Sequence, residues 1–134
     1  MGLANAKLTL SNPQKPGLQP VNVDALADTG AIHLCVPQHL ATQLELTEIA
    51  RREVVTADGA THLCAYVGPL QVSFENRTCF AGALVLGDSV LLGAVPMEDM
   101  DLVVTPSLRR VTVNPANPNI ALSIAKGFRS HCPA

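Results

Sequence analysis

The sequence predicts one all-β domain, a barrel-like arrangement of many short strands with one or two short helices. Three observations support this prediction: apolar and polar residues alternate over short runs, turn-forming residues separate those runs, and only two stretches have a helical pattern. The length of 134 residues is enough to bury one core but not two. We therefore expect a single domain over residues 1–119 and a tail over residues 120–134, which is a candidate docking segment for a second subunit.

The first two predicted strands lead toward an Asp-Thr-Gly sequence. Residues 7–10 alternate polar and apolar side chains, and residues 11–20 contain three prolines and a glycine, which predicts a loop between strands. Residues 19–27 place apolar side chains on one face, and this alternation breaks just before Asp28. We expect this strand to deliver Asp28 into a fully buried setting.

A third strand and a first helix should follow. Residues 32–36 are mostly apolar and predict a strand. Pro37 suits the first turn of a helix, where no backbone N–H is needed, and the apolar residues up to Leu44 fall on one helical face. We expect a short helix over residues 37–44.

A long hairpin is predicted around Ala57-Asp58-Gly59-Ala60. Residues 53–56 and 61–67 are strand-like runs, and Asp-Gly between two such runs is a strong hairpin signal. The tip of this hairpin is polar.

The rest of the chain predicts a meander that ends in a short helix and a final pair of strands. Gly68-Pro69 predicts a turn between strands, and Asn114 to Asn119 predicts a break. For residues 120–125 the pattern fits either a helical turn or a strand that docks on a partner. The remaining predicted elements are strands 70–74 and 78–86, an apolar run 89–93 closed by glycine, a helix over 96–100, and strands 102–104 and 110–113 around Pro106-Ser107.

Composition and charge narrow the choice of partners. Hydrophobic residues make up 48% of the chain and charged residues 15%, which leaves apolar surface for a second subunit to cover. A net charge of −2, one Tyr and no Trp give neither a basic footprint nor a stacking platform for bases. We therefore predict a homo-oligomer and no nucleic-acid partner.

Targeting signals and metal-ligand patterns are absent from the sequence. No window approaches the roughly 18 apolar residues of a membrane span, and the N-terminus lacks the apolar stretch of a signal peptide, so we expect a cytoplasmic protein with no membrane partner. The histidines His33, His39 and His62 fall on different predicted elements, and we predict neither a metal nor a cofactor. The four cysteines have no Cys-x-x-Cys spacing and should be reduced, partly buried thiols: Cys35, Cys64, Cys79 and Cys132.

Asp28-Thr29-Gly30 alone is compatible with an ordinary β-turn. Its surroundings make it more informative, because a strand enters it, an apolar strand follows it, and a distant apolar run ends in glycine before a short helix. Together these segments resemble the retropepsin-like family, the retroviral-type aspartic proteases, and in particular its small bacterial members. The matching segments are Ala27-Asp28-Thr29-Gly30-Ala31, the Asp58-Gly59 hairpin tip where that family has its flap, and Val90-Leu91-Leu92-Gly93.

The resemblance implies a closed six-stranded acid protease barrel and assigns roles to residues. Asp28 would be the catalytic aspartate, with Thr29 and Gly30 as its supporting turn. Ala31, Ala57, Asp58 and Gly59 would contact substrate, and Leu91, Leu92 and Gly93 would support the site from beneath and beside it.

The chemistry of this family needs two carboxylates that share one proton, one to take a proton from water and one to polarise the scissile carbonyl. The chain has a single Asp-Thr-Gly, and neither Asp58-Gly59-Ala60 nor Asp88-Ser89-Val90 is a second copy. A two-fold homodimer would supply the second carboxylate as Asp28 of another subunit.

Three positions depart from the viral members. Ile32 and His33 stand where viral members carry acidic residues that hold the substrate backbone, and Ala94 follows Gly93 where they carry an arginine that ties the subunits together. Asp58 at the hairpin tip fits either a substrate contact or an ordinary turn residue.

The function predicted from the sequence is an aspartic endopeptidase that acts as a homodimer on peptide or protein substrates. The main alternative is a non-catalytic protein- or peptide-binding module that keeps the same fold. A self-processing enzyme is a third hypothesis, with Asn114 to Asn119 as its exposed cleavage segment.

Overall fold

The structure is a computed structural model that describes residues 4–127; residues 1–3 and 128–134, which include Cys132 and the end of the predicted tail, lie outside the described residues. Within residues 4–127 the chain forms strands, two short α-helices and one 3-10 turn. In order these are β1 (Ala4–Ser11), β2 (Val21–Ala27), β3 (Leu34–Val36), α1 (Gln38–Gln43), β4 (Thr47–Val55), β5 (Thr61–Phe74), β6 (Arg77–Val85), β7 (Val90–Leu92), α2 (Ala94–Asp99), β8 (Leu102–Thr105), η1 (Pro106–Leu108) and β9 (Arg110–Val113).

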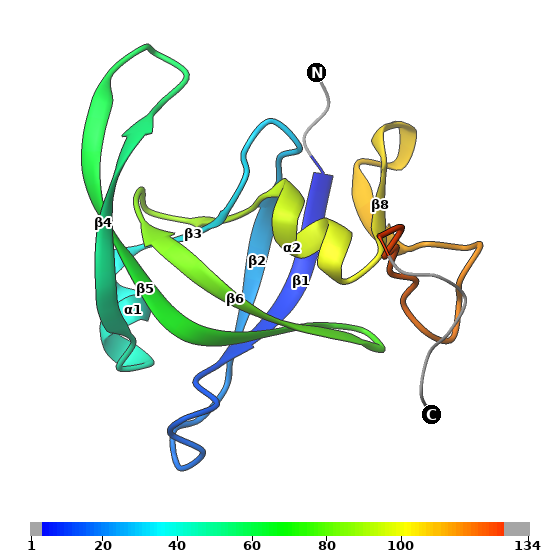
Figure 1. Cartoon of the computed structure of the whole chain (residues 1–134), viewed down its shortest axis with the longest axis horizontal. Helices are drawn as coiled ribbons and strands as arrows, with labels where there is room; N and C mark the ends of the chain where they lie inside the picture. The colour runs from blue at the N-terminus through cyan, green and yellow to red at the C-terminus, as the bar shows by residue number, and fades with distance from the viewer. Residues whose placement is uncertain (1–3, 128–134) are drawn as a thin grey trace.

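Six strands close into a barrel (Figure 1). Neighbouring strands are hydrogen-bonded in the order β5-β6-β3-β7-β2-β1, and the end of β1 also pairs with β5, which completes the circle. Residues 9–11 of β1 face residues 71–73 of β5 in this closing contact. The predicted closed barrel with short helices is therefore confirmed.

The barrel interior is filled by apolar side chains. Every second residue of β1 points inward, and these four are at most 2% exposed: Ala4, Ala6, Leu8 and Leu10. Leu34 of β3, Leu70 and Val72 of β5, and Leu92 of β7 join them in one continuous core. Burial of a leucine or valine side chain stabilises a fold by about 1.5–3 kcal/mol, so this core holds the surrounding strand ends in fixed positions.

Two extensions project from the barrel on opposite sides. The part of β5 that precedes Tyr66 does not pair with β6 and lies outside the barrel. It pairs with β4, and the two strands form a long hairpin whose tip stands clear of the molecule (Figure 1). On the other side, β9 touches β1 through a single parallel bridge and pairs with β8. The Asp-Gly hairpin predicted from the sequence is therefore present.

The hairpin is longer than predicted, and Gly68-Pro69 does not turn the chain. β4 begins at Thr47, whereas the sequence predicted a start at Glu53. The prediction missed the first residues because almost all side chains of β4 are exposed, so the strand has no apolar alternation. β5 runs straight through Gly68-Pro69, where its register with β6 shifts between Val67 and Leu70. Such an irregularity accepts proline, since a residue there need not donate to the ladder.

The segment after β9 contains neither helix nor strand up to residue 127. The structure thus shows neither of the two conformations considered for residues 120–125, and docking of this tail on a partner stays a prediction. No helix in the described part of the chain is long and apolar enough to cross a membrane.

Candidate active site

Asp28 lies on a turn that the strand pairing holds in place. β2 runs parallel to β7, with Leu26 opposite Leu91 and Ala27 opposite Leu92. The backbone N–H of Asp28 continues this ladder and donates to the carbonyl of Leu92 at 2.9 Å, and the N–H of Ala31 donates back to the Asp28 carbonyl at 3.1 Å. The end of one strand is therefore tied both to its neighbour and to its own turn.

Gly30 orients the Asp28 carboxylate. Its backbone N–H donates to Oδ1 of Asp28 at 2.9 Å, and a Cβ at position 30 would lie only 3.1 Å from the same oxygen. A larger side chain at Gly30 would crowd the carboxylate that its N–H now holds.

Asp28 is half-buried, and Thr29 and Gly30 are exposed. The expectation that Asp28 is fully buried was therefore wrong, because the turn that follows β2 lifts it out of the core that covers Ala27. Within residues 4–127, no basic side chain forms an ion pair with Asp28. The carboxylate is therefore partly exposed to solvent and has no charged partner among the described residues.

Gly93 lies directly against the loop that follows Asp28. A Cβ on Gly93 would lie 2.3 Å from the carbonyl oxygen of His33, which leaves room only for glycine. The next two backbone N–H groups, of Ala94 and Val95, donate to the carbonyls of Ala31 and Ile32 at 2.7 and 2.9 Å. The start of α2 and the Asp28 loop thus form one hydrogen-bonded unit.

Leu91 and Leu92 lie in β7 beside the end of β2. Leu92 is fully buried in the main core, whereas Leu91 is half-buried and packs in a smaller cluster with Cys35 and Cys64. The structure therefore brings together Asp28, Ala31, Gly93 and the two leucines predicted to support them.

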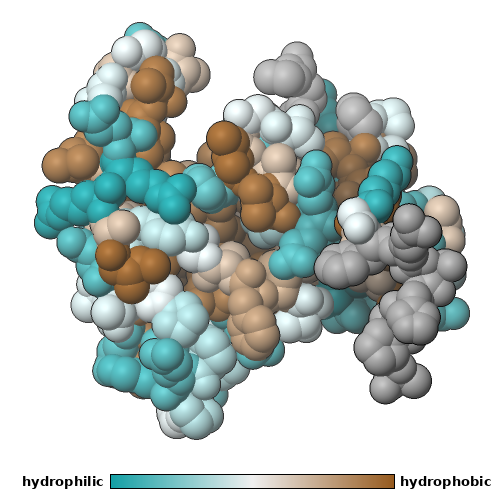
Figure 2. Space-filling model, viewed as in Figure 1, coloured by the Kyte–Doolittle hydropathy of each residue, from teal (hydrophilic) through white to brown (hydrophobic). Residues whose placement is uncertain are grey.

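The predicted substrate-contacting residues at the hairpin tip are not joined to Asp28. Asp58 bonds within the tip: Oδ1 accepts from the Thr56 hydroxyl at 2.5 Å and from the Ala60 N–H at 3.0 Å. These two hydrogen bonds, that of Thr56 first, lower the pKa of Asp58 below its ordinary value. Gly59 has a φ of +84° and so takes the left-handed conformation that the turn needs. Ala57, Asp58 and Gly59 are exposed, and Figure 2 shows an open hollow between the hairpin and the rest of the molecule.

A polar cluster that the sequence did not indicate lies at the inner side of the hairpin. Nη1 of Arg52, from β4, lies 3.1 Å from Nε2 of His33, and the guanidinium carbon lies 4.2 Å from the centre of the Tyr66 ring. The rings of His33 and Tyr66 meet edge to face with centres 5.9 Å apart. Burial, and then the Arg52 charge, lower the pKa of His33. These three residues come from separate elements, so no local spacing could have grouped them.

The three described cysteines are buried and free. Burial raises the pKa of Cys35, with a smaller effect of Cys64, and burial together with Asp99 raises the pKa of Cys79 to about 12. Within residues 4–127 no three His, Cys, Asp or Glu side chains come together as metal ligands.

A search of solved structures places this architecture. The retroviral protease-like domain of Ddi1 from Leishmania major superposes with a TM-score of 0.52 over 84% of this chain and 90% of that domain, at 13% sequence identity. The chain has the retropepsin-like fold. The simian foamy virus protease (TM-score 0.46, 21% identity, 68% of this chain and 92% of that one) and a retropepsin-like aspartic protease from Rickettsia conorii (TM-score 0.43, 20% identity, 72% and 81%) are also similar.

Comparison of the sequence with family profiles and curated proteins found no match. The function of this retropepsin-like chain must therefore be argued from its own residues.

Proposed function

We propose that the protein is an aspartic endopeptidase whose active site forms when two copies of the chain bring their Asp28 carboxylates together. The observation that carries this proposal is the setting of Asp28: a half-buried carboxylate, held by the N–H of Gly30 and paired with no basic side chain of residues 4–127. Asp58 accepts an equivalent hydrogen bond in the hairpin tip, so what distinguishes Asp28 is its place at the end of β2, beside β7 in a retropepsin-like fold.

Two such carboxylates can hydrolyse a peptide bond without a nucleophilic side chain. At about 3 Å separation and an effective dielectric constant of about 20, two negative charges repel by about 5 kcal/mol, so near neutral pH the pair holds one proton. The ionised carboxylate then takes a proton from water, and the protonated one donates to the carbonyl oxygen of the scissile bond. No metal or cofactor takes part in this scheme.

Apolar side chains around Asp28 support a partner at this surface. Ile32 is 62% exposed and Val95 is 51% exposed, and the hydrogen bond between their backbones places them side by side next to the Asp28 turn. Exposed apolar side chains also follow the last strand, at Ile120, Leu122 and Ile124. A second subunit would remove both groups from water, and the tail from residue 120 would be one of its docking segments.

The β4–β5 hairpin would close over bound substrate. Its tip residues Ala57, Asp58 and Gly59, together with Ala31 beside Asp28, would line the side of the hollow that the peptide enters. The hydrogen bonds of Asp58 within the tip favour a role in shaping the tip, with substrate contacts made chiefly by backbone groups.

The Asp28→Asn variant tests this proposal. It removes the proton-transfer group and keeps the size of the side chain, so peptidase activity should fall by at least about a hundredfold. Activity is measured on a peptide library between pH 4 and 7, with circular dichroism and sedimentation to establish that the variant is folded and assembled. Asp88→Asn, at an exposed residue in the turn between β6 and β7, is the matched control. Equal activity in Asp28→Asn and the wild type would refute the assignment.

The alternative is a peptide-binding module without turnover. One observation favours it: Ile32 and His33 replace the substrate-gripping acidic residues, and His33 is occupied by Arg52. A transition-state mimic with a hydroxyl in place of the scissile carbonyl distinguishes the two, since only a catalytic site binds it more tightly than the matching peptide. Self-processing at residues 114–119 would appear as a change of intact mass on incubation.

A further inference from the structure

Arg52, His33 and Tyr66 join the hairpin to the loop that carries Asp28. Arg52 comes from β4, Tyr66 from β5, and His33 from the residues between Asp28 and β3. The guanidinium lies over the Tyr66 ring and bonds to the His33 imidazole, so two neighbours fix its position. A cation over an aromatic face is attracted by the ring, and this holds an otherwise mobile arginine in place.

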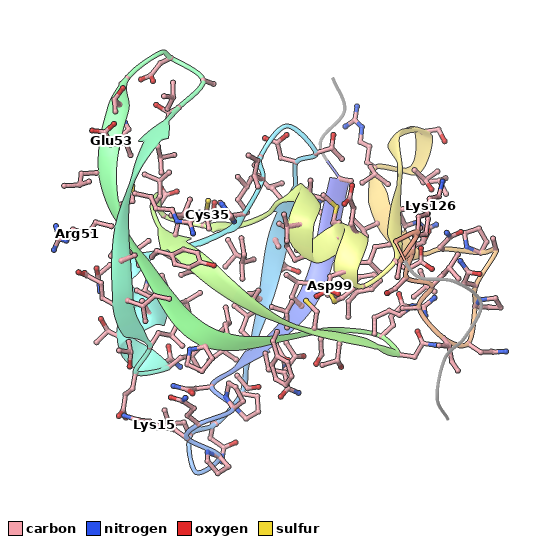
Figure 3. The ribbon with its side chains drawn as sticks, viewed as in Figure 1. Lys15, Cys35, Arg51, Glu53, Asp99 and Lys126 are labelled. Carbon is pink, nitrogen blue, oxygen red and sulfur yellow. The ribbon has the colours of Figure 1, made fainter. Side chains whose placement is uncertain are left out.

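Arg52 is on the inner face of the hairpin. Directly opposed residues of an antiparallel ladder share one face, and here Arg52 opposes Cys64 while Ala50 opposes Tyr66. Cys64 and Tyr66 pack together with Cys35, the residue two positions after His33. Arg51 and Glu53 belong to the other face and point away from the hollow (Figure 3).

The guanidinium keeps most of its hydrogen-bonding capacity. Arginine has five N–H donors and no acceptor, so His33 Nε2 must be the acceptor in the contact with Nη1, and His33 is then neutral. Arg52 is exposed, and in the described part of the chain it makes no other hydrogen bond and no ion pair. Its remaining N–H groups form the planar fork that binds a carboxylate through two parallel hydrogen bonds.

His33 has a fixed place relative to the candidate active site. Its carbonyl lies against Gly93, and the residues just before it accept hydrogen bonds from the start of α2. The Arg52 fork therefore stands at one end of the rigid loop whose other end is Asp28. A peptide bound across Asp28 and under the hairpin would therefore run toward the Arg52 guanidinium.

We propose that Arg52, positioned by His33 and Tyr66, is a specificity subsite that binds the carboxylate of a glutamate or aspartate side chain in the peptide substrate. This inference rests on the proposed function, since it deepens the same site by naming its substrate class. Ile32 is apolar and His33 accepts from Arg52, so the guanidinium is the charge that this cluster presents to a peptide.

Paired peptides test the subsite. Peptides with both ends blocked carry glutamate or glutamine at one position, which is moved in turn along four residues on each side of the scissile bond. With wild-type protein, glutamate at one of these positions should raise kcat/KM about tenfold over glutamine, as expected for a hydrogen bond to a charged group. The difference should lie mainly in KM.

Substitutions at Arg52 separate a specificity role from a structural one. In Arg52→Gln the ratio of kcat/KM for the glutamate and glutamine peptides should fall to about one, and Arg52→Glu should prefer a lysine peptide. Arg51→Gln, on the outer face, should behave as the wild type. Equal cleavage of glutamate and glutamine peptides by the wild type would overturn the proposal, as would an Arg52→Gln variant that loses activity on all peptides equally.

The subsite can fail or stand independently of the protease assignment. If the wild type cleaves no peptide, the same blocked peptides are used in a binding measurement with the wild type and Arg52→Gln. Tighter binding of the glutamate peptide that disappears in Arg52→Gln supports the subsite on a non-catalytic module. Equal binding of the two peptides overturns it, and cleavage without a glutamate preference overturns it while leaving the protease assignment intact.

Discussion

At the scale of single residues, Gly93 and Gly82 each leave space that another group occupies. The missing side chain of Gly93 is replaced by the His33 carbonyl, and that of Gly82 by the ring and hydroxyl of Tyr66. Neither glycine has a positive φ, so the reason for glycine is close approach and not backbone conformation. The contact at Gly93 positions the loop that follows Asp28, and the contact at Gly82 positions the Tyr66 ring on which Arg52 lies.

Gly93→Ala should destabilise the protein by about 1–3 kcal/mol and reduce activity, because the new methyl group meets backbone that cannot retreat. Two hydrogen bonds hold the opposing segment in place. Urea unfolding measures the loss in the free energy of unfolding. Gly17→Ala, where a Cβ meets nothing within 4 Å, is the control. If both variants are equally stable, the close contact at Gly93 has no energetic role.

Gly82→Ala should displace Tyr66, since a Cβ there would lie 2.1 Å from the phenol oxygen. The expected loss in the free energy of unfolding is again about 1–3 kcal/mol. A double-mutant cycle isolates the contact: in a Tyr66→Ala background the Gly82→Ala substitution should have almost no effect on unfolding. An equal loss in both backgrounds would mean that Tyr66 does not fill the space at Gly82.

At the scale of elements, the segment after β9 is held to the body by Asp101. Oδ1 of Asp101 accepts from the side-chain amide of Asn114 at 3.0 Å, and Oδ2 accepts from Asn117 at 2.8 Å and from the Leu122 N–H at 2.9 Å. Arg77, which is 2% exposed, also donates to the Asn117 carbonyl. An irregular segment is thus ordered up to the exposed apolar residues proposed to dock on a partner.

Asp101→Asn should release this segment, because an amide cannot accept on both of its polar atoms. Amide hydrogen exchange at Leu122, corrected for intrinsic rates, should quicken relative to the wild type. Asp88→Asn, which makes the same change at an exposed residue away from this segment in the sequence, serves as control. Unchanged protection at Leu122 would show that Asp101 does not hold the tail.

The same contact should depend on pH. Hydrogen bonds to its carboxylate, that from Leu122 first, lower the pKa of Asp101 below its ordinary value of 3.8. Because the folded state favours the ionised form, the contribution of this contact to stability is fully present above pH 3.8 and is lost as the pH falls through the lowered value. Protection of Leu122 in the wild type should therefore fall below pH 3.8, and in Asp101→Asn it should not change there.

At the scale of the whole molecule, the proposed activity belongs to a pair of chains. One chain supplies one Asp28, so activity should require assembly. Specific activity of the wild type should rise with protein concentration and level off once sedimentation shows the dimer. A strict monomer with constant specific activity would contradict the proposal.

Mixing the wild type with Asp28→Asn tests the shared site directly. A mixed dimer holds one carboxylate and one amide. At a fixed concentration of wild-type chain, an excess of Asp28→Asn should therefore reduce the activity well below that measured without the variant. Addition of an excess of Asp88→Asn should not reduce it. Undiminished activity in the presence of Asp28→Asn would mean that the two sites do not share their aspartates.

Local signals in the sequence were sufficient for much of the fold and for the central residue of the candidate site. The Asp58-Gly59 turn, Pro37 before α1 and the alternation in β1 each act within a few residues, and each element is present. Gly68-Pro69 was misinterpreted because its local turn propensity is overridden by strand pairing. β6 pairs with β5 on one side, and on the other side β4 pairs with it up to Gly68 and β1 pairs with it from Gln71. The predicted strand at β4 was too short because an exposed strand lacks a hydrophobic pattern.

By itself the sequence determined the strand-rich class, the hairpin and the presence of Asp28-Thr29-Gly30 on a turn, because strand alternation and turn chemistry are properties of neighbouring residues. Only the tertiary structure decided that β7 lies beside β2, that Gly93 meets the His33 carbonyl, and that Arg52 reaches His33 over Tyr66. These contacts join residues far apart in the chain. They form because closing the barrel buries one shared core, and that burial sets which strand ends meet.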